Sequence, residues 1–238
     1  MAVWKRTIAI AVTAAVAAVV ALAPANALTI KEIKAKGTLT IGALVDYPPF
    51  GLLDSSGKAV GYDPDLAKEF ADSLGVKLTI LPVTSANRVQ YLLSGQVDGL
   101  FASLGIIPDR MKVVDFSEPY SGSVLAVYGD KGVKVSTAAD LSGKTIGVTR
   151  GTIQDTAVTK IAPKDTNIQR YDDDASSAQA LMSGQVPLLG VADVNIAEID
   201  KIAPDRFDKK KADGSLAALY QKWMQRPIPE FVLKTAAN

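Results

Sequence analysis

The sequence contains no cysteine and no histidine. Without cysteine, the chain has neither a disulfide framework nor the lipid-attachment residue of a bacterial lipoprotein. A histidine-based catalytic triad and a transition-metal site of the usual ligands are excluded as well, because their side chains are missing. We therefore expect no disulfide, no metal and no cofactor.

An excess of charge is also missing. The 26 lysine and arginine residues nearly balance the 25 aspartate and glutamate residues, and the longest basic run is Lys209-Lys210-Lys211. A nucleic-acid-binding surface needs clustered positive charge, so nucleic acid is not expected as a partner. With 48% hydrophobic and 21% charged residues, the composition is that of a globular protein that can bury a core.

Long apolar runs are scarce, and the clearest one lies near the amino terminus. Lys5 and Arg6 precede an apolar run over residues 7–22, and Ala25-Asn26-Ala27 offers small residues for cleavage. This pattern predicts a signal peptide over residues 1–27. The alternative is a retained membrane anchor, but 16 apolar residues are fewer than the ~20 that a spanning helix needs. We therefore expect a soluble protein exported to the periplasm.

A ligand-binding turn is predicted within the stretch from Asp98 to Tyr120. We expect a buried strand at Gly99–Ala102, a turn of small residues, a helical turn that carries Arg110, and a second strand at Val113–Phe116. Open α/β sheets bind ligands at the carboxyl ends of their strands, and an arginine there can hold an anion. The stretch therefore indicates a site for a small molecule.

The same stretch reads D-x-x-x-A-S-L-G-x-x-P-x-R-x-K-x-V-D-F-S-x-P-Y. It resembles the signature of family 3 solute-binding proteins, the periplasmic receptors of ABC transporters for polar amino acids. The resemblance implies a two-lobed α/β fold of the type II periplasmic binding protein kind, in which each lobe is a small sheet flanked by helices. It also implies a cleft between the lobes for a free amino acid, with Ser103, Leu104 and Arg110 as ligand-binding residues, and an inner-membrane permease as partner.

An internal repeat supports two similar lobes. Leu93-Ser94-Gly95-Gln96-Val97 recurs as Met182-Ser183-Gly184-Gln185-Val186, in each case after an apolar helix and before an apolar strand. Glycine is the usual helix C-cap, which explains its place in both copies.

We expect the chain to cross between the lobes near Ser121. Lobe one then comprises residues 28–120 and 211–238, lobe two comprises residues 121–210, and the protein is a monomer.

Two side chains of lobe one are candidates for the ligand site. Tyr47 follows the strand predicted at Thr38–Leu44 on a loop with two prolines. In the family the matching aromatic residue stacks on the ligand, and the alternative is that Tyr47 packs on Phe50. Arg88 begins a predicted helix. Similar relatives that bind acidic amino acids carry an arginine here, but a solvated surface charge is an equal alternative.

In lobe two, Gly151 and Thr152 join a predicted strand at Lys144–Val148 to a predicted helix at Ile153–Ile161. Backbone N–H groups and the helix dipole make such a junction an anion site. The resemblance implies that Gly151 and Thr152 hold the α-carboxylate of the ligand, and the simpler role of Thr152 is that of an N-cap. Asp193 either receives the ammonium group of the ligand or caps the helix that follows.

Three further local predictions come from caps and prolines. Asp63 is expected to cap a helix that has Pro64 at its first position. The strand at 76–80 is expected to stop at Pro82. Asp172-Asp173-Asp174 is expected to cap the helix at 175–183, where acidic side chains favour the helix dipole. A metal site at these residues is not expected, because the loop spacing of a calcium site is absent.

The sequence departs from the family beyond Asp208. In relatives the chain continues with a strand that returns to lobe one and then with most of a long helix. Here Lys209-Lys210 leads directly into residues 211–223, which resemble the last helix of the family. This difference predicts an internal deletion near Lys210, whether by natural loss, engineering or sequence error. Lobe one would then lack a strand and would keep an open sheet edge.

The resemblance implies a binding protein, not an enzyme. Gly105 resembles the residue at this position in the branch of the family that binds acidic amino acids. Ile107 and Ile153 stand where members of the family frequently have threonine. We therefore expect glutamate, aspartate or their amides as ligand. One alternative is an enzyme on the same fold, similar to cyclohexadienyl dehydratases, for which Glu118 and Asp193 are the candidate general acids. The other is an amino acid sensor that does not serve transport.

Overall fold

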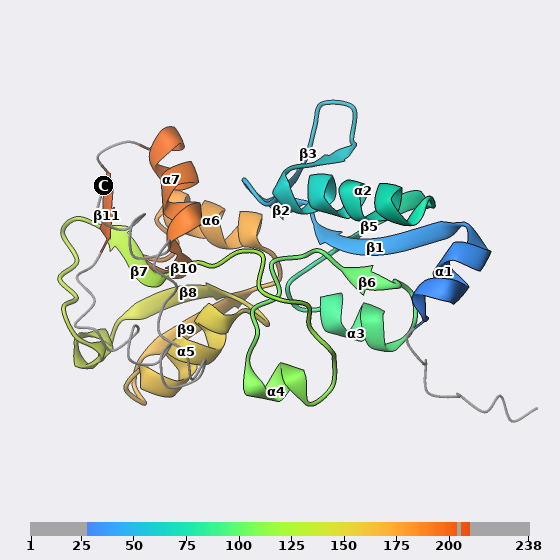
Figure 1. Ribbon diagram of the computed structural model, residues 1–238. Helices are drawn as coiled ribbons and strands as arrows, with labels where there is room; N and C mark the ends of the chain where they lie inside the picture. The colour runs from blue at the N-terminus through green and yellow to red at the C-terminus, as the bar shows by residue number, and fades with distance from the viewer. Residues whose placement is uncertain (1–27, 204–205, 210–238) are drawn as a thin grey trace, which may run out of the picture.

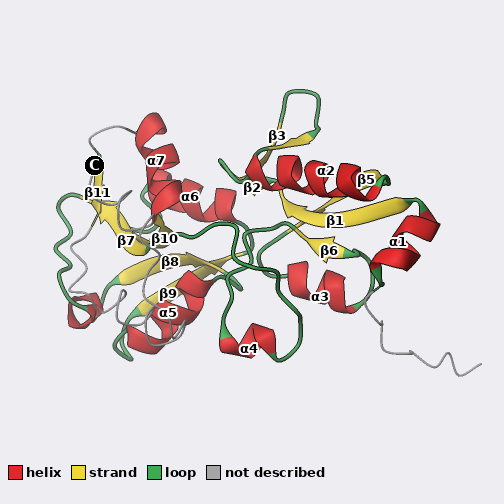
Figure 2. Ribbon diagram, viewed as in Figure 1, coloured by secondary structure: helices red, strands yellow, loops and turns green. Residues whose placement is uncertain are grey.

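The computed structural model describes residues 28–203 and 206–209 (Figure 1). They form two lobes, each of them a sheet flanked by helices, which confirms the expected architecture (Figure 2). No helix in this part of the chain is long and apolar enough to cross a bilayer. The signal peptide, the deletion near Lys210 and the carboxyl-terminal part of lobe one lie outside the described residues and stay predictions.

The first lobe is built on a parallel sheet in the order β5-β1-β6. Its strands are β1 (Thr38–Leu44), β5 (Lys77–Val83) and β6 (Gly99–Leu100). Its helices are α1 (Ile30–Lys36), α2 (Tyr62–Leu74) and α3 (Arg88–Leu93). Strand β1 is central and almost wholly buried, because its apolar side chains pack on α1 and α2 on one face and against α3 on the other.

A small antiparallel sheet projects from the first lobe. It consists of β2 (Asp46–Tyr47), β3 (Gly51–Leu53) and β4 (Ala59–Val60). It follows directly on the carboxyl end of β1, so it places residues 46 and 47 at the edge of the lobe that faces the second lobe.

The second lobe is a five-stranded mixed sheet in the order β11-β7-β10-β8-β9. Its strands are β7 (Leu125–Asp130), β8 (Thr145–Thr149), β9 (Asn167–Tyr171), β10 (Leu188–Ala192) and β11 (Phe207–Lys209). Its helices are α5 (Ile153–Ile161), α6 (Asp174–Ser183), α7 (Asp193–Ile202) and the short 3-10 turn η1 (Ala138–Leu141). Apolar clusters cover both faces of the sheet, one beneath α5 and the other beneath α6 and α7.

Several local predictions are confirmed. The helix at Ile153–Ile161 has the predicted bounds, and Thr152 caps it by accepting a hydrogen bond from the Asp155 N–H at 3.1 Å. Of the three consecutive aspartates, Asp173 is the N-cap of α6. Gly184 ends α6 in the left-handed conformation that the repeat predicted.

The strand predicted at Val113–Phe116 is wrong. These residues lie in the loop after α4 (Pro108–Met111), and no described strand pairs with them. Val113 is 52% exposed, so its apolar character does not reflect burial in a sheet. Strand β6 is also shorter than predicted and ends at Leu100, because the chain leaves the sheet there to reach α4.

The predictions for the end of strand β5 and for the N-cap of helix α2 are also wrong. Strand β5 continues through Pro82, which is tolerated because the described sheet pairs β5 on one side only. The cap of α2 is Gly61, not Asp63. Gly61 has a φ of 122°, and a Cβ there would lie 2.7 Å from the Phe50 carbonyl oxygen. Glycine therefore starts the helix, and Asp63 turns into the interior.

Candidate functional site

A cavity of about 240 Å³ lies between the two lobes, where the strands of both sheets end. Its wall combines loops of the first lobe, the connecting segment 116–123 and the first residues of α5 and α6. Six residues predicted from the sequence line it: Tyr47, Arg88, Ser103, Leu104, Arg110 and Thr152. Gly151 and Asp193 are not among the lining residues.

Arg110 extends from α4 into the cavity, where two backbone carbonyl groups hold its guanidinium. Nη1 donates to the Gly105 oxygen at 3.0 Å and Nη2 donates to the Gly151 oxygen at 2.8 Å. The second bond joins the lobes, because Gly151 follows β8. Burial lowers the pKa of Arg110 to about 10, and the neighbouring Arg88 adds to this effect. The side chain is still charged at neutral pH, and the two carbonyl groups fix its direction.

Arg88 is buried, so the alternative that it is a solvated surface charge is wrong. The residue is 3% exposed, and its Nη1 donates to the Ala102 oxygen. Its Nε has no hydrogen-bond partner among the described residues. Burial lowers the pKa of Arg88, and the negative charge of Asp174 opposes that shift. A buried guanidinium with an unused donor favours an anionic ligand at this wall.

Asp174 is a cavity residue that the sequence analysis did not single out. It is the first residue of α6, and Ser85 of the first lobe donates to its carboxylate at 3.4 Å. Burial is the main reason that the pKa of Asp174 rises to about 6, and repulsion from Asp46 contributes. Asp174 lies just beyond the end of β9, and this position is the sequence signal that indicates a cavity residue. The same position also fits a helix cap, which is the role that the sequence predicted.

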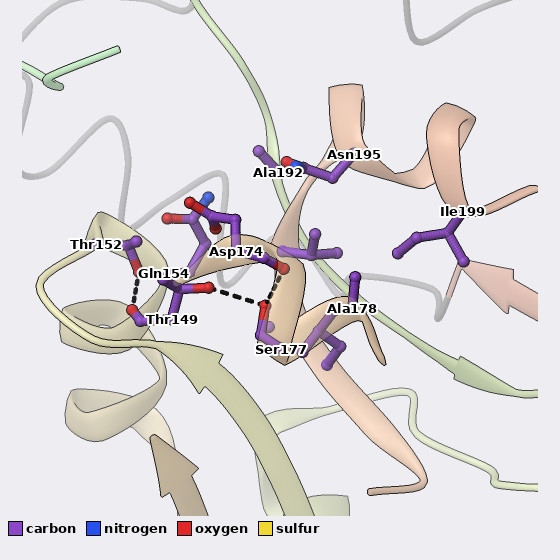
Figure 3. A pocket seen from close by; sticks show the side chains of 12 residues that line it. Thr149, Thr152, Gln154, Asp174, Ser177, Ala178, Ala192, Asn195 and Ile199 are labelled. Atoms are coloured by element: carbon purple, nitrogen blue, oxygen red, sulfur yellow. Dashed lines mark hydrogen bonds between the residues drawn. The ribbon is translucent and has the colours of Figure 1, made fainter. Parts of the chain in front are cut away.

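Hydroxyl groups of the second lobe hold Asp174 from below (Figure 3). The Ser177 hydroxyl donates to the Asp174 backbone oxygen at 2.9 Å, and the Thr149 and Ser177 hydroxyls are 2.9 Å apart. A cavity of about 10 Å³ beside them has room for roughly one water molecule. These contacts fix the start of α6 and thereby the direction of the carboxylate.

Replacing Asp174 by asparagine should remove a pH dependence of stability. Because the folded-state pKa of about 6 lies above the ordinary value of 3.8, Asp174 binds its proton more tightly in the folded protein. The contribution of this proton to the free energy of unfolding is fully present below about pH 4 and is lost as pH rises through 6. We expect the Asp174→Asn variant to gain about 2 kcal/mol over the native protein between pH 4 and 7.5.

Urea unfolding of both proteins across this pH range measures the effect. Asp173→Asn is the matched control, because Asp173 caps the same helix with its side chain at the surface of the second lobe. Parallel pH profiles for native protein and Asp174→Asn would contradict the prediction.

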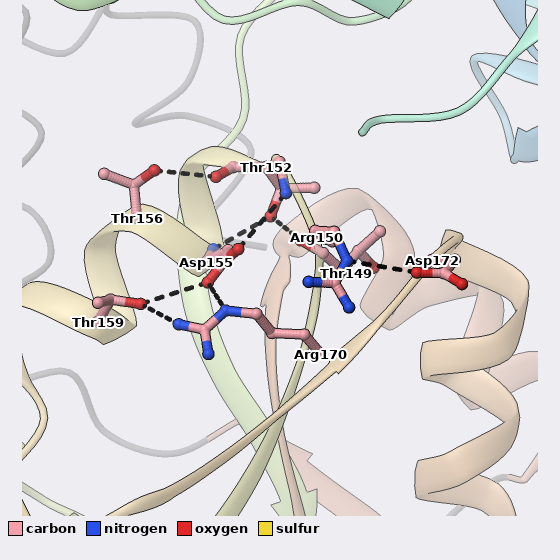
Figure 4. A network of polar contacts seen from close by, with 9 residues as sticks. Thr149, Arg150, Thr152, Asp155, Thr156, Thr159, Arg170 and Asp172 are labelled. Carbon is pink, nitrogen blue, oxygen red and sulfur yellow. Dashed lines mark hydrogen bonds and ion pairs between the residues drawn. The ribbon is translucent and has the colours of Figure 1, made fainter. Parts of the chain in front are cut away.

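The Gly151-Thr152 junction is an ordered turn at the start of α5 (Figure 4). The Thr152 hydroxyl donates to the Thr149 oxygen at 2.7 Å and accepts from the Asp155 N–H. Asp155 is held in turn by an ion pair with Arg170 at 2.9 Å. The N–H groups of Gly151 and Thr152 make only long bonds of 3.4 Å within the turn. They are weakly engaged donors at the positive end of a helix.

Ser103 is held in an unusual backbone conformation beside the cavity. Its φ of 48° is left-handed, which is uncommon for a residue other than glycine. The Ser103 hydroxyl donates to one Asp63 oxygen at 3.1 Å, and the Tyr120 hydroxyl donates to the other at 3.2 Å. Asp63 is fully buried, and burial raises its pKa although these bonds oppose the shift. Sequence reasoning missed Asp63 because it expected a helix cap.

Tyr47 packs on Phe50, as one of the two roles predicted from the sequence requires, and its stacking on a ligand stays a prediction. Its ring stacks on Phe50 with 5.7 Å between the centroids, and both rings line the cavity. The ring is 8% exposed, so it presents an apolar wall to the cavity and contributes to the core of the first lobe.

Asp193 lies at the connection between the lobes. Its carboxylate accepts from the Val124 N–H and from the Val194 N–H, each at 3.0 Å. The Asp193 N–H also donates to the Val124 oxygen at 2.9 Å. These bonds fix the entry of the chain into β7 beside the start of α7. Its assignment to the ammonium group of a ligand stays a prediction, and Asp174 is the aspartate among the residues that line the cavity.

Solved structures of amino acid-binding proteins are similar to this fold. Arginine-binding ArgBP from T. maritima in its holo form has a TM-score of 0.71 and 27% identity, covering 86% of this chain and 97% of that chain. The cysteine-binding protein from Campylobacter jejuni has a TM-score of 0.71 and 33% identity, covering 76% and 73%. Both likenesses extend over the two lobes of the fold.

Sequence relatives are of the same kind. The L-cystine-binding protein TcyJ of Escherichia coli is 30% identical over 190 residues, which cover 79% of this chain and 68% of the relative. The glutamine-binding protein GlnH of Bacillus subtilis is 28% identical, covering 85% and 86%. The family of bacterial extracellular solute-binding proteins, family 3, matches residues 39–226. Because this match spans more than half of the sequence, the chain belongs to the family 3 bacterial extracellular solute-binding proteins.

Proposed function

We propose that this protein binds a free acidic amino acid, glutamate or aspartate, in the cavity between its lobes. The observation that carries the proposal is the presence of two arginines, the buried Arg88 and the partly buried Arg110, in the wall of one cavity. Two cations removed from water need counter-charges. A ligand with two carboxylates supplies one for each, whereas a neutral amino acid leaves Arg88 with only the charges of Asp174 and Asp63.

Each ligand group has a proposed partner. Arg110, with the N–H groups of Gly151 and Thr152, receives the α-carboxylate, and Arg88 receives the side-chain carboxylate. Asp174 or Asp193 receives the ammonium group. The ring of Tyr47, the backbone at Leu104 and the Ser103 turn then enclose the apolar carbons. This arrangement pairs every charge of the ligand within a closed cleft.

The relatives support a transport role. Those with known ligands are named for binding cystine, cysteine, glutamine, arginine or histidine. They are binding proteins, so the same role is proposed here: capture in the periplasm as a monomer and delivery to the permease of an ABC transporter. An enzyme similar to cyclohexadienyl dehydratases would need a general acid in the cavity, and Glu118 is the lining residue that offers one beside Asp174.

Thermal unfolding with a panel of amino acids tests the proposal. A ligand that binds only the folded state stabilises it by about 2.7 kcal/mol at a hundred times its dissociation constant. We expect glutamate or aspartate to raise the melting temperature more than glutamine, arginine or cystine. An equal or larger shift with a neutral or basic amino acid would remove the acidic assignment, and turnover of prephenate would establish an enzyme.

Replacing Arg88 by methionine should separate acidic from neutral ligands. Loss of one partner of a buried charge pair costs about 2–5 kcal/mol, so affinity for the acidic ligand should fall at least thirtyfold. Affinity for the matching amide should change far less, because the amide brings no second charge. Isothermal titration with both ligands measures this difference. Arg88→Lys keeps the charge and should retain part of the preference, while an equal loss for both ligands would contradict the role of Arg88.

A further inference from the structure

A carboxylate of the first lobe reaches the amino end of a helix in the second lobe. Asp46 lies on β2, and its Oδ2 accepts a hydrogen bond from the Asp174 N–H at 2.8 Å. The Ala175 N–H donates to the same carboxylate. Both donors belong to the first turn of α6, whose N–H groups have no partner within the helix. The two segments are 128 residues apart in the sequence.

Helix α6 therefore has two acidic caps. Asp173, from its own lobe, accepts from the Ser176 N–H at 2.7 Å. Asp46, from the opposite lobe, accepts from the two N–H groups that precede Ser176. A negative charge at this end of a helix is favourable because of the helix dipole. The Asp173 cap is kept whenever the second lobe is folded, whereas the Asp46 cap exists only while the two lobes are in contact.

Asp46 does not line the cavity, although its neighbour Tyr47 does. Its contact with α6 is consequently separate from any contact with a ligand. Two further contacts join the lobes nearby, from Ser85 to Asp174 and from Arg110 to Gly151. The contact of Asp46 differs from both, because Asp46 is not among the residues that line the cavity, whereas Ser85, Arg110 and Asp174 are.

The surroundings of Asp46 show why the contact matters. Burial raises the pKa of Asp46, the two N–H groups of α6 oppose that shift, and Asp173 adds to it. The Asp174 carboxylate also repels Asp46. A partly buried carboxylate beside other acids needs strong donors to remain charged. Separation of the lobes would return Asp46 to water, so the N–H groups of α6 are what hold it in the closed form.

We propose that Asp46 is a positioning residue that stabilises the closed cleft by capping α6 from the opposite lobe. It thereby sets how tightly and how long a ligand is held, without touching the ligand. The inference goes beyond the proposed acidic ligand, since it applies to any amino acid that the closed cleft encloses.

Three variants test this role. Asp46→Ala removes the cross-lobe cap, Asp46→Asn keeps an oxygen acceptor without the charge, and Asp173→Ala removes the cap within the second lobe. Loss of an N-cap corresponds to about a tenfold change in an equilibrium constant. We expect Asp46→Ala to raise the dissociation rate of L-glutamate about tenfold with little change in the association rate. Asp46→Asn should recover part of this loss.

Asp173→Ala should behave in the opposite way. It should lower the melting temperature of the ligand-free protein, because it weakens α6 itself, and leave the dissociation rate within about twofold of native. A role of Asp46 in folding alone would instead lower the melting temperature of Asp46→Ala and leave its dissociation rate unchanged. That result would overturn the proposal.

The absence of native cysteine allows a direct measurement of closure. Spin labels at Glu69→Cys in the first lobe and Lys164→Cys in the second report the distance between the lobes, with and without L-glutamate. Asp46→Ala should shift the distances toward the open form relative to native and Asp173→Ala. Failure of native protein to bind L-glutamate would count against the acidic ligand, while the ligand-free distances still test the cap. Identical distance distributions for native protein and Asp46→Ala, both with and without L-glutamate, would overturn the proposed role of Asp46.

Discussion

Replacing Arg110 by alanine should cause the largest loss of ligand binding. The guanidinium is held by the Gly105 and Gly151 carbonyl oxygens, so it is already oriented when an anion enters the cavity. Removing one partner of a buried, hydrogen-bonded charge pair costs about 2–5 kcal/mol. The dissociation constant should therefore rise by a factor between about thirty and several thousand. Isothermal titration with the amino acid that gives the largest thermal shift measures the loss.

Two variants make this experiment specific. Arg110→Lys keeps a positive charge but cannot reach both carbonyl groups with a planar fork, so it should restore only part of the affinity. Arg150→Ala removes an arginine from the same region that pairs with Asp172 at the surface and does not line the cavity. Its affinity should stay within about twofold of native. A comparable loss for Arg110→Ala and Arg150→Ala would show that only the overall charge matters.

Replacing Gly151 by alanine should prevent the lobes from closing. A Cβ at Gly151 would lie 2.8 Å from the Ser85 oxygen and 3.0 Å from the Ala86 Cα, both in the backbone of the first lobe. Backbone atoms cannot move aside as a flexible side chain can, so the clash has to be relieved by separating the lobes. We expect affinity for the ligand to fall at least tenfold, with a cleft that is open in solution. Small-angle scattering with and without ligand measures the closure.

Gly143→Ala is the matched control for this variant. Gly143 lies in the same lobe with a φ of 66°, close to the 75° of Gly151, but nothing lies within 4 Å of an added Cβ. Both variants should lose about 1 kcal/mol of stability to the strained backbone. Only Gly151→Ala should lose affinity. If both variants bind alike, the approach of Gly151 to Ser85 is not part of closure.

The amino-acid sequence by itself determined most of the local structure. The helix at Ile153–Ile161, its Thr152 cap and the left-handed Gly184 follow from apolar period, capping chemistry and glycine conformation. Arg110 was also predictable as a cavity residue, because it follows the carboxyl end of a strand of an open sheet, whereas Tyr47 was predicted from the resemblance to the family. These features depend on neighbours within a few residues.

Only the tertiary structure decided the electrostatics of the cavity. An arginine in the first turn of a helix is ordinarily solvated, whereas Arg88 is buried against the Ala102 carbonyl oxygen and near the carboxylate of Asp174. The role of Asp174 depends on Ser85, which is 89 residues away, and that of Asp46 on α6. Asp63 was expected to cap a helix and instead holds Ser103 and Tyr120. The physical reason is the same in each case: a charge takes its protonation and its partners from what surrounds it in space, and those surroundings come from distant parts of the chain.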